Sequence, residues 1–133
     1  MQASFSWDWG PAFPSMGIWK NVQLISTSEV LVTEITTDIY KNDGIWEITI
    51  TTLFELPPNE EDSTIMCNIS SMLYIDNSSY IQNSTDVILQ MKNQHATAST
   101  MLHVYTELVN RWWPNGYGKQ NLYTLKVTIT TAT

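Results

Sequence analysis

Two stretches of the sequence alternate between apolar and polar residues, and this period-2 pattern constrains the fold more than any other feature. From Ile45 to Leu56 the even-numbered positions are apolar except for Thr52, while most odd-numbered positions are Glu or Thr. From Tyr123 to Thr130 apolar residues again alternate with Thr and Lys. Successive side chains of a β-strand point to opposite faces, so each stretch predicts a strand with one face in a core and one in water.

Further strands are expected elsewhere, since Thr, Ser, Asn and Ile are abundant and long helix-forming stretches are missing. A shorter alternating series runs from Leu102 to Leu108. Less regular β-rich segments lie at Val22 to Ile25, Val30 to Tyr40, Ile65 to Ile75 and Asp86 to Met91. Turn-forming residues separate them at Lys41 to Gly44, Pro57 to Asp62, Asp76 to Ser79 and Pro114 to Gly116. We therefore expect an all-β fold, an immunoglobulin-like two-sheet antiparallel sandwich of about seven strands.

The first residues of the chain follow a different pattern from the rest. The first 20 residues are rich in aromatic residues, Pro and Gly and show no periodicity. We expect residues 1–24 to be the C-terminal remnant of a preceding domain, with the sandwich formed by residues 25–133. A chain of 133 residues has room for one sizeable core and not for two full domains.

Charge and composition exclude several classes of partner. The chain carries 13 acidic and 6 basic residues, a formal net charge of −7, and no basic cluster. Nucleic acid and anionic membranes are therefore not expected partners, and no apolar run reaches the ~18 to 20 residues of a membrane span. The single cysteine, Cys67, is expected to be a small buried residue, and His95 and His103 lack neighbours at ligand spacing. No metal site and no cofactor are expected.

The segment Trp7-Asp8-Trp9 carries the most suggestive chemistry. Indole faces stack on the apolar face of a sugar ring, and a carboxylate accepts hydrogen bonds from two sugar hydroxyls. Gly10 and Pro11 are expected to fix a sharp turn. The alternative is structural: both tryptophans fill the join between two domains, and Asp8 caps a turn.

Two motifs are similar to β-mannosidases of glycoside hydrolase family 2. Phe5 to Pro11 (Phe-Ser-Trp-Asp-Trp-Gly-Pro) and Pro14 to Lys20 resemble the end of that family's N-terminal sugar-binding-type domain. Trp112 to Tyr123, which begins Trp-Trp-Pro-Asn-Gly-Tyr-Gly, resembles a signature late in its immunoglobulin-like second domain. The two motifs occur in the family's order, separated by the length of one sandwich domain.

The resemblance implies a multidomain retaining β-mannosidase in which a TIM barrel holds both catalytic glutamates. That barrel is not part of this sequence, so we expect no catalytic residue here and an inactive isolated chain. The glutamates of the chain are expected to be solvated surface charges: Glu29, Glu34, Glu47, Glu55, Glu60, Glu61 and Glu107.

The resemblance also implies roles for individual residues. Trp7, Asp8 and Trp9 would contact the non-reducing mannose of a β-mannoside oligosaccharide, whereas Gly10, Pro11 and Trp19 would be structural. An interdomain corner would comprise Trp112, Trp113, Pro114, Gly116 and Gly118, with one indole in the core and the other against the barrel. Carbohydrate contact at this corner is the less favoured interpretation. Arg111 would pair with a carboxylate of a neighbouring domain.

Three N-glycosylation sequons begin at Asn68, Asn77 and Asn83. Asn77 and Asn83 lie in polar, loop-like surroundings and are the better candidates, because Asn68 lies in an apolar stretch. If they are used, the parent protein is lysosomal or secreted.

Two other functions remain open from the sequence. The chain is a stand-alone carbohydrate-binding or adhesion module, or it belongs to a related glycosidase such as a β-galactosidase or β-glucuronidase. If a neighbouring domain normally covers Trp7, Trp9 and Trp19, the isolated chain is expected to be weakly stable or to self-associate.

Overall fold

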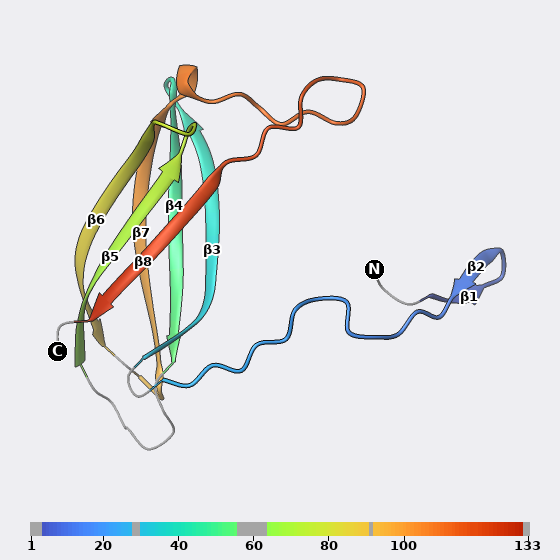
Figure 1. Cartoon of the computed structure of the whole chain (residues 1–133), viewed down its shortest axis with the longest axis horizontal. Coiled ribbons are helices and arrows are strands. Elements are labelled where there is room, and N and C mark those ends of the chain that lie inside the picture. The colour runs from blue at the N-terminus through green and yellow to red at the C-terminus, as the bar shows by residue number, and fades with distance from the viewer. Residues whose placement is uncertain (1–3, 28–29, 56–63, 91, 132–133) are drawn as a thin grey trace.

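The described part of the chain forms a β-sandwich with a separate N-terminal hairpin (Figure 1). The computed structural model describes residues 4–27, 30–55, 64–90 and 92–131. Two sheets of three antiparallel strands, ordered β3-β4-β7 and β6-β5-β8, make up the sandwich. Their bounds are β3 Leu31–Asn42, β4 Ile45–Glu55, β5 Thr64–Tyr74, β6 Tyr80–Gln90, β7 His95–Tyr105 and β8 Thr124–Thr131. The expected all-β sandwich is confirmed.

The core lies between the two sheets and follows the alternation seen in the sequence. On β4 the residues Ile48, Ile50, Thr52 and Phe54 are buried, while the residues between them are partly exposed. On β7 every second residue from Ala96 to Val104 is buried. Those from Ala96 to Leu102 pair with the buried residues of β4, and Val104 pairs with the partly buried Trp46. Period-2 burial on adjacent strands therefore builds one wall of the core.

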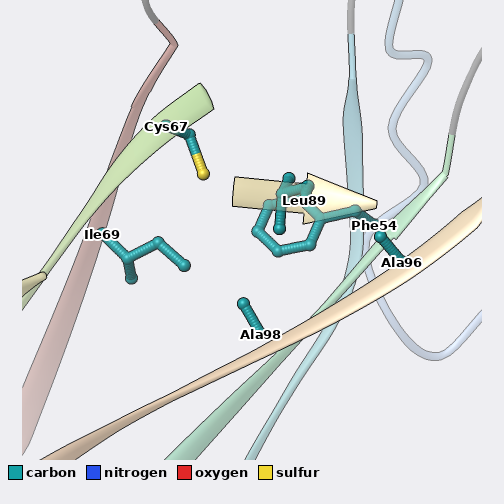
Figure 2. Close-up of a cluster of buried hydrophobic side chains, with 6 residues drawn as sticks. All are labelled: Phe54, Cys67, Ile69, Leu89, Ala96 and Ala98. Carbon is teal, nitrogen blue, oxygen red and sulfur yellow. The ribbon is translucent and has the colours of Figure 1, made fainter. Parts of the chain in front are cut away.

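The opposite wall comes from β5 and β6. Figure 2 shows Cys67 and Ile69 pointing from β5 toward Ala98, with Leu89 of β6 beside Phe54. Cys67 is buried as expected, and burial raises the pKa of its thiol above the ordinary value. A second buried cluster, centred on Ile48, Ile50, Leu73, Leu102 and Val104, continues the core toward the other end of the sandwich.

Short turns connect neighbouring strands of the sandwich. Asn42 pairs with Ile45, so Asp43 and Gly44 form a two-residue hairpin loop with φ values of 37° and 83°. Positive φ at both positions suits the right-handed twist of a hairpin, and the predicted turn is confirmed. The predicted loop from Pro57 to Asp62 lies outside the described residues.

Some strand boundaries differ from the prediction. Val22 to Ile25 is irregular and exposed, so the strand predicted there is wrong; its apolar residues have no partner strand in the described chain. β6 begins at Tyr80, six residues before the predicted start, because an edge strand tolerates the polar run from Gln82 to Asp86. β7 ends at Tyr105, and Thr106–Leu108 is a 3₁₀ helix. The described sandwich thus has six strands where about seven were expected.

Two buried threonines allow a matched test of how a buried hydroxyl group affects the free energy of unfolding, with and without a hydrogen-bond partner. Thr52 Oγ1 is buried and has no hydrogen-bond partner among the described residues, whereas Thr100 Oγ1 lies 3.0 Å from Ser71 Oγ, joining the two sheets. Thr52→Val should raise the free energy of unfolding by about 1 kcal/mol, because it removes an unpaired buried hydroxyl. Thr100→Val should lower it by about 1 to 3 kcal/mol, because it leaves the Ser71 hydroxyl unpaired. Urea denaturation measures both, and equal losses from the two variants would contradict this account.

Candidate functional site

The Trp7-Asp8-Trp9 segment forms the tip of the N-terminal hairpin. β1 (Ser4–Trp7) pairs with β2 (Gly10–Phe13), and Trp7 lies opposite Gly10, so Asp8 and Trp9 form the two-residue loop. Ser6 has φ of 76°, and its hydroxyl donates a hydrogen bond of 2.7 Å to the Gly10 carbonyl. A sharp turn is therefore present, with Asp8 and Trp9 at its centre and Gly10 as its last residue, while Pro11 lies within β2.

The hairpin tip presents its aromatic residues openly. Trp7 is 80 % exposed and Trp9 is 90 % exposed, and Asp8 between them is also exposed. A sugar site normally encloses most of its ligand in a concave surface. The tip can thus offer stacking faces and a carboxylate, but another surface must complete a pocket around it. Trp19, further along the segment, is also exposed and lies under the Lys20 ammonium at 4.6 Å.

The Trp112 to Gly118 segment is a tightly folded corner between β7 and β8. The Trp113 amide donates to the Lys119 carbonyl at 3.0 Å, and the Tyr117 amide donates to the Pro114 carbonyl at 3.0 Å. Gly116 adopts φ of 85°, which favours glycine. A Cβ on Gly118 would lie 2.8 Å from the Trp113 ring, so the indole packs directly over this glycine.

Neither tryptophan of the corner enters the core. Trp112 is 51 % exposed and Trp113 is 46 % exposed, so the expectation that one indole is buried in the sandwich is wrong. The physical reason is that the corner lies outside the two sheets, where Gly118 supplies the contact surface for Trp113. Both indoles remain accessible to a further surface.

An apolar groove of about 710 Å³ lies beside this corner, between the edges of β3 and β8. Ile39 and Trp46 line it from one sheet, Leu73 and Leu125 from the other, and Trp112 from the corner. Two cations approach the Trp46 ring, Lys41 Nζ at 5.8 Å and Arg111 Cζ at 5.7 Å. The sequence did not single out Trp46, since only the register of β3 and β4 and the course of the 109–112 segment bring these groups together.

Two polar contacts hold the base of the corner. The Asn110 amide donates to Tyr123 Oη at 2.7 Å, and Asn121 Nδ2 donates to the Arg111 carbonyl at 2.8 Å. The sequence predicted Tyr123 only as a core-facing residue. The hydrogen bond that its hydroxyl accepts could not be predicted, because the donor is the backbone amide of Asn110, which no local pattern links to Tyr123. Arg111 stacks near Trp46 within this chain, so its pairing with another domain stays a prediction.

The three sequons lie in different environments. Asn77 is exposed in the β5–β6 turn, where Asp76 Oδ1 accepts hydrogen bonds from Ser78 and Ser79. Hydrogen bonds donated to this carboxylate, first by the Ser79 hydroxyl and then by the Ser78 amide and hydroxyl, hold the pKa of Asp76 well below its usual range. Asn68 is part of β5, and its side chain bonds to Asp86 and Ser84. Asn83 is part of β6 and not of a loop, contrary to expectation, and donates to the Met101 carbonyl at 2.9 Å.

The glutamates and histidines of the described chain lie at exposed or partly exposed positions. Glu34 and Glu107 are exposed, and Glu47 and Glu55 are partly exposed on β4, whereas Glu29, Glu60 and Glu61 lie outside the described residues. His95 and His103 are exposed on β7. Across the described ranges, no three His, Cys, Asp or Glu side chains gather where they would hold a metal ion. Nor does any helix there have the length and apolarity to cross a membrane.

Comparison with known proteins identifies the family. A model described as glycosyl hydrolases family 2 matches residues 29–133. The chain belongs to glycosyl hydrolase family 2. The resemblance seen in the two aromatic motifs is confirmed.

Several relatives of this family 2 chain are β-mannosidases. The chain is 31 % identical over 132 residues to the β-mannosidase of Bos taurus, covering 96 % of this chain and 14 % of that protein. It is 33 % identical over 144 residues to β-mannosidase A of Aspergillus flavus, covering 97 % and 15 %. The crystal structure of β-D-mannosidase from Dictyoglomus thermophilum matches with a TM-score of 0.62 at 23 % identity, over 95 % of this chain and 14 % of that one. The chain thus spans about one seventh of the length of the relatives it matches.

Gly118 offers a test of the corner. Gly118→Ala should lower the free energy of unfolding by about 1 to 2 kcal/mol and shift the Trp113 indole N–H resonance, because the new methyl overlaps the ring. Denaturation and NMR measure these effects. In a Trp113→Ala background the same substitution should cost little, since the overlapping ring is gone. An undiminished cost in that background would contradict direct packing of Trp113 on Gly118.

Proposed function

We propose that this chain is the non-catalytic immunoglobulin-like domain and active-site loop of a β-mannosidase that removes terminal non-reducing β-D-mannose with retention. The observation that carries the proposal is the family 2 match over residues 29–133, preceded by a hairpin that exposes Trp7, Asp8 and Trp9. β-Mannosidase relatives that align over nearly the whole chain support the substrate class over a β-galactosidase or β-glucuronidase.

Retaining hydrolysis requires two carboxyl groups about 5 to 5.5 Å apart, one as nucleophile and one as acid/base. On β4, Glu47 and Glu55 are separated by most of the strand's length, and Glu34 and Glu107 are exposed on other elements. In our proposal a separate barrel of the parent protein supplies both catalytic glutamates. The isolated chain is therefore inactive.

The hairpin's role in this proposal is to complete the mannose subsite. Asp8 accepts hydrogen bonds from two sugar hydroxyls, and Trp7 and Trp9 provide apolar walls for the C–H face of the ring. The exposure of all three side chains supports this role, because a neighbouring surface can close over them. Burial at a domain junction without sugar contact is the competing role for the same residues.

The sandwich and the corner act as a scaffold in the proposed enzyme. Trp112 and Trp113 remain half exposed on a tightly bonded corner, which suits packing against the barrel. The partners of the chain are then a β-mannoside oligosaccharide, through the parent enzyme, and neighbouring domains of the same polypeptide. The exposed sequon at Asn77 supports a lysosomal or secreted parent.

A stand-alone binding module would bind sugar without any other domain, and this distinguishes it from a scaffold. Titration of the isolated chain with mannose and mannobiose, followed through its six indole N–H signals, should show no shift at millimolar sugar. The hairpin tip alone does not enclose a ligand, which is the physical reason for this expectation. Saturable shifts of Trp7 and Trp9 would favour the binding module instead.

The subsite role of Asp8 is tested in the parent enzyme. Asp8→Ala should lower kcat/KM for a β-mannoside by about 10- to 100-fold, the worth of one or two hydrogen bonds to a charged acceptor. The control is Asp76→Ala, which removes an acidic residue from an exposed turn of the sandwich and should leave kcat/KM unchanged. Equal kinetics for the Asp8 variant and the parent would assign the hairpin to domain packing.

A further inference from the structure

The side chains of the three sequon asparagines are used differently in the folded chain. Asn68 Nδ2 donates a hydrogen bond of 2.8 Å to Asp86 Oδ1, and Asn68 Oδ1 accepts one of 2.8 Å from Ser84 Oγ. The carboxamide of Asn68 thus links β5 to β6 through both of its polar atoms. A glycan on Nδ2 would crowd this link, because the first sugar is bulky and takes the place of one amide hydrogen.

Asn83 lies on the core-facing side of β6, where it bridges the two sheets. It pairs with Ser71, which is fully buried, and its Nδ2 donates to the Met101 carbonyl of β7 at 2.9 Å. β6 and β7 belong to different sheets and lie against each other. A sugar attached to Asn83 Nδ2 would therefore lie at the contact of the two strands and hold the sheets apart.

Asn77 occupies the exposed tip of the turn between β5 and β6. The Ile75 amide donates to the Ser79 carbonyl at 2.9 Å. Asp76 Oδ1 accepts hydrogen bonds from the amides of Ser78 and Ser79. Backbone groups and the Asp76 carboxylate thus shape the turn, while the side chain of Asn77 faces solvent. A glycan at this position leaves the bonds of the turn in place.

Two tyrosines stand at the base of this turn. Tyr74 ends β5 and Tyr80 begins β6, the two residues pair in register, and their ring centroids are 6.1 Å apart. Tyr80 is 53 % exposed, so part of this aromatic pair is open to solvent beside the turn. Each tyrosine is three residues from Asn77, a span of at most about 11 Å along an extended chain. An accessible aromatic face of this kind stacks on the C–H face of a sugar ring.

We propose that Asn77 is the N-glycosylation site of the folded chain and that the first N-acetylglucosamine of the glycan packs on the Tyr74–Tyr80 pair. The transfer forms a bond between Asn77 Nδ2 and C1 of that sugar. The bond from C1 to the phosphate of a lipid-linked oligosaccharide breaks, so the lipid pyrophosphate leaves with the electron pair, and a base takes the amide proton. The inference rests on the proposed lysosomal or secreted location of the parent protein.

The experiment expresses the chain behind a secretion signal in eukaryotic cells and maps its glycans. Peptide N-glycosidase converts each glycosylated asparagine to aspartate, and mass spectrometry of peptides then locates the converted residues. In the soluble chain Asn77 should be occupied, while Asn68 and Asn83 should be unmodified. Asn77→Gln should abolish the mass loss that the glycosidase causes. A soluble chain without a glycan at Asn77, or with one at Asn68 or Asn83, would overturn the inference.

Packing of the sugar on the tyrosines is tested by a double-mutant cycle. The glycosylated chain should melt about 2 °C or more above Asn77→Gln, because the sugar covers an exposed aromatic face in the folded state. In a Tyr80→Ser background this difference should fall by at least about half. Equal differences in the two backgrounds would overturn this part of the inference. Since the experiment supplies the secretion signal and uses no β-mannoside, an unoccupied Asn77 would leave the mannosidase proposal standing.

Discussion

Burial of alternate side chains on β4 is the interaction on which the rest of the structure depends. β4 is the central strand of its sheet, hydrogen-bonded to β3 on one side and β7 on the other. Its inward residues Ile48, Ile50 and Phe54 contribute to both buried clusters and so link the two ends of the core. Removing each such side chain from water contributes about 1.5 to 3 kcal/mol. A one-residue change in register would turn all of them to the solvent face, so the pattern also specifies the pairing.

The same core positions two aromatic motifs that the sequence places far apart. The corner at 112–118 is anchored through Asn110 and Tyr123, which join the chain after β7 to the chain just before β8. The hairpin at 4–13 has its own local bonds and stands apart from the sandwich in Figure 1. In the proposed enzyme the sandwich is thus a rigid support, while the exposed indoles provide contacts to other domains and to substrate.

The sequence predicted the strands that bury one face and expose the other, and the turns whose own residues favour the turn conformation. β4 and β8 lie where apolar and polar residues alternate in the sequence, and the hairpin turn lies at Asp43 and Gly44, two residue types that tolerate positive φ. β6 was predicted too short, because most of its residues are exposed at a sheet edge and its first half has few apolar residues. The segment Val22 to Ile25 has strand-like composition without a partner strand, and composition alone does not reveal whether a partner exists.

The candidate site also has a part that the sequence predicted and a part that it did not. The sequence was enough to select Trp7, Asp8, Trp9 and the Trp112 to Gly118 corner, because each is a short run that contains uncommon residues such as Trp. The sequence by itself also determined the fold class, since period-2 burial is a local property of the chain. Only the tertiary structure placed Lys41 and Arg111 on Trp46, left both corner indoles half exposed, and opened a groove between β3 and β8. These features depend on which strand edges meet, and that is decided by long-range pairing and packing rather than by any local pattern.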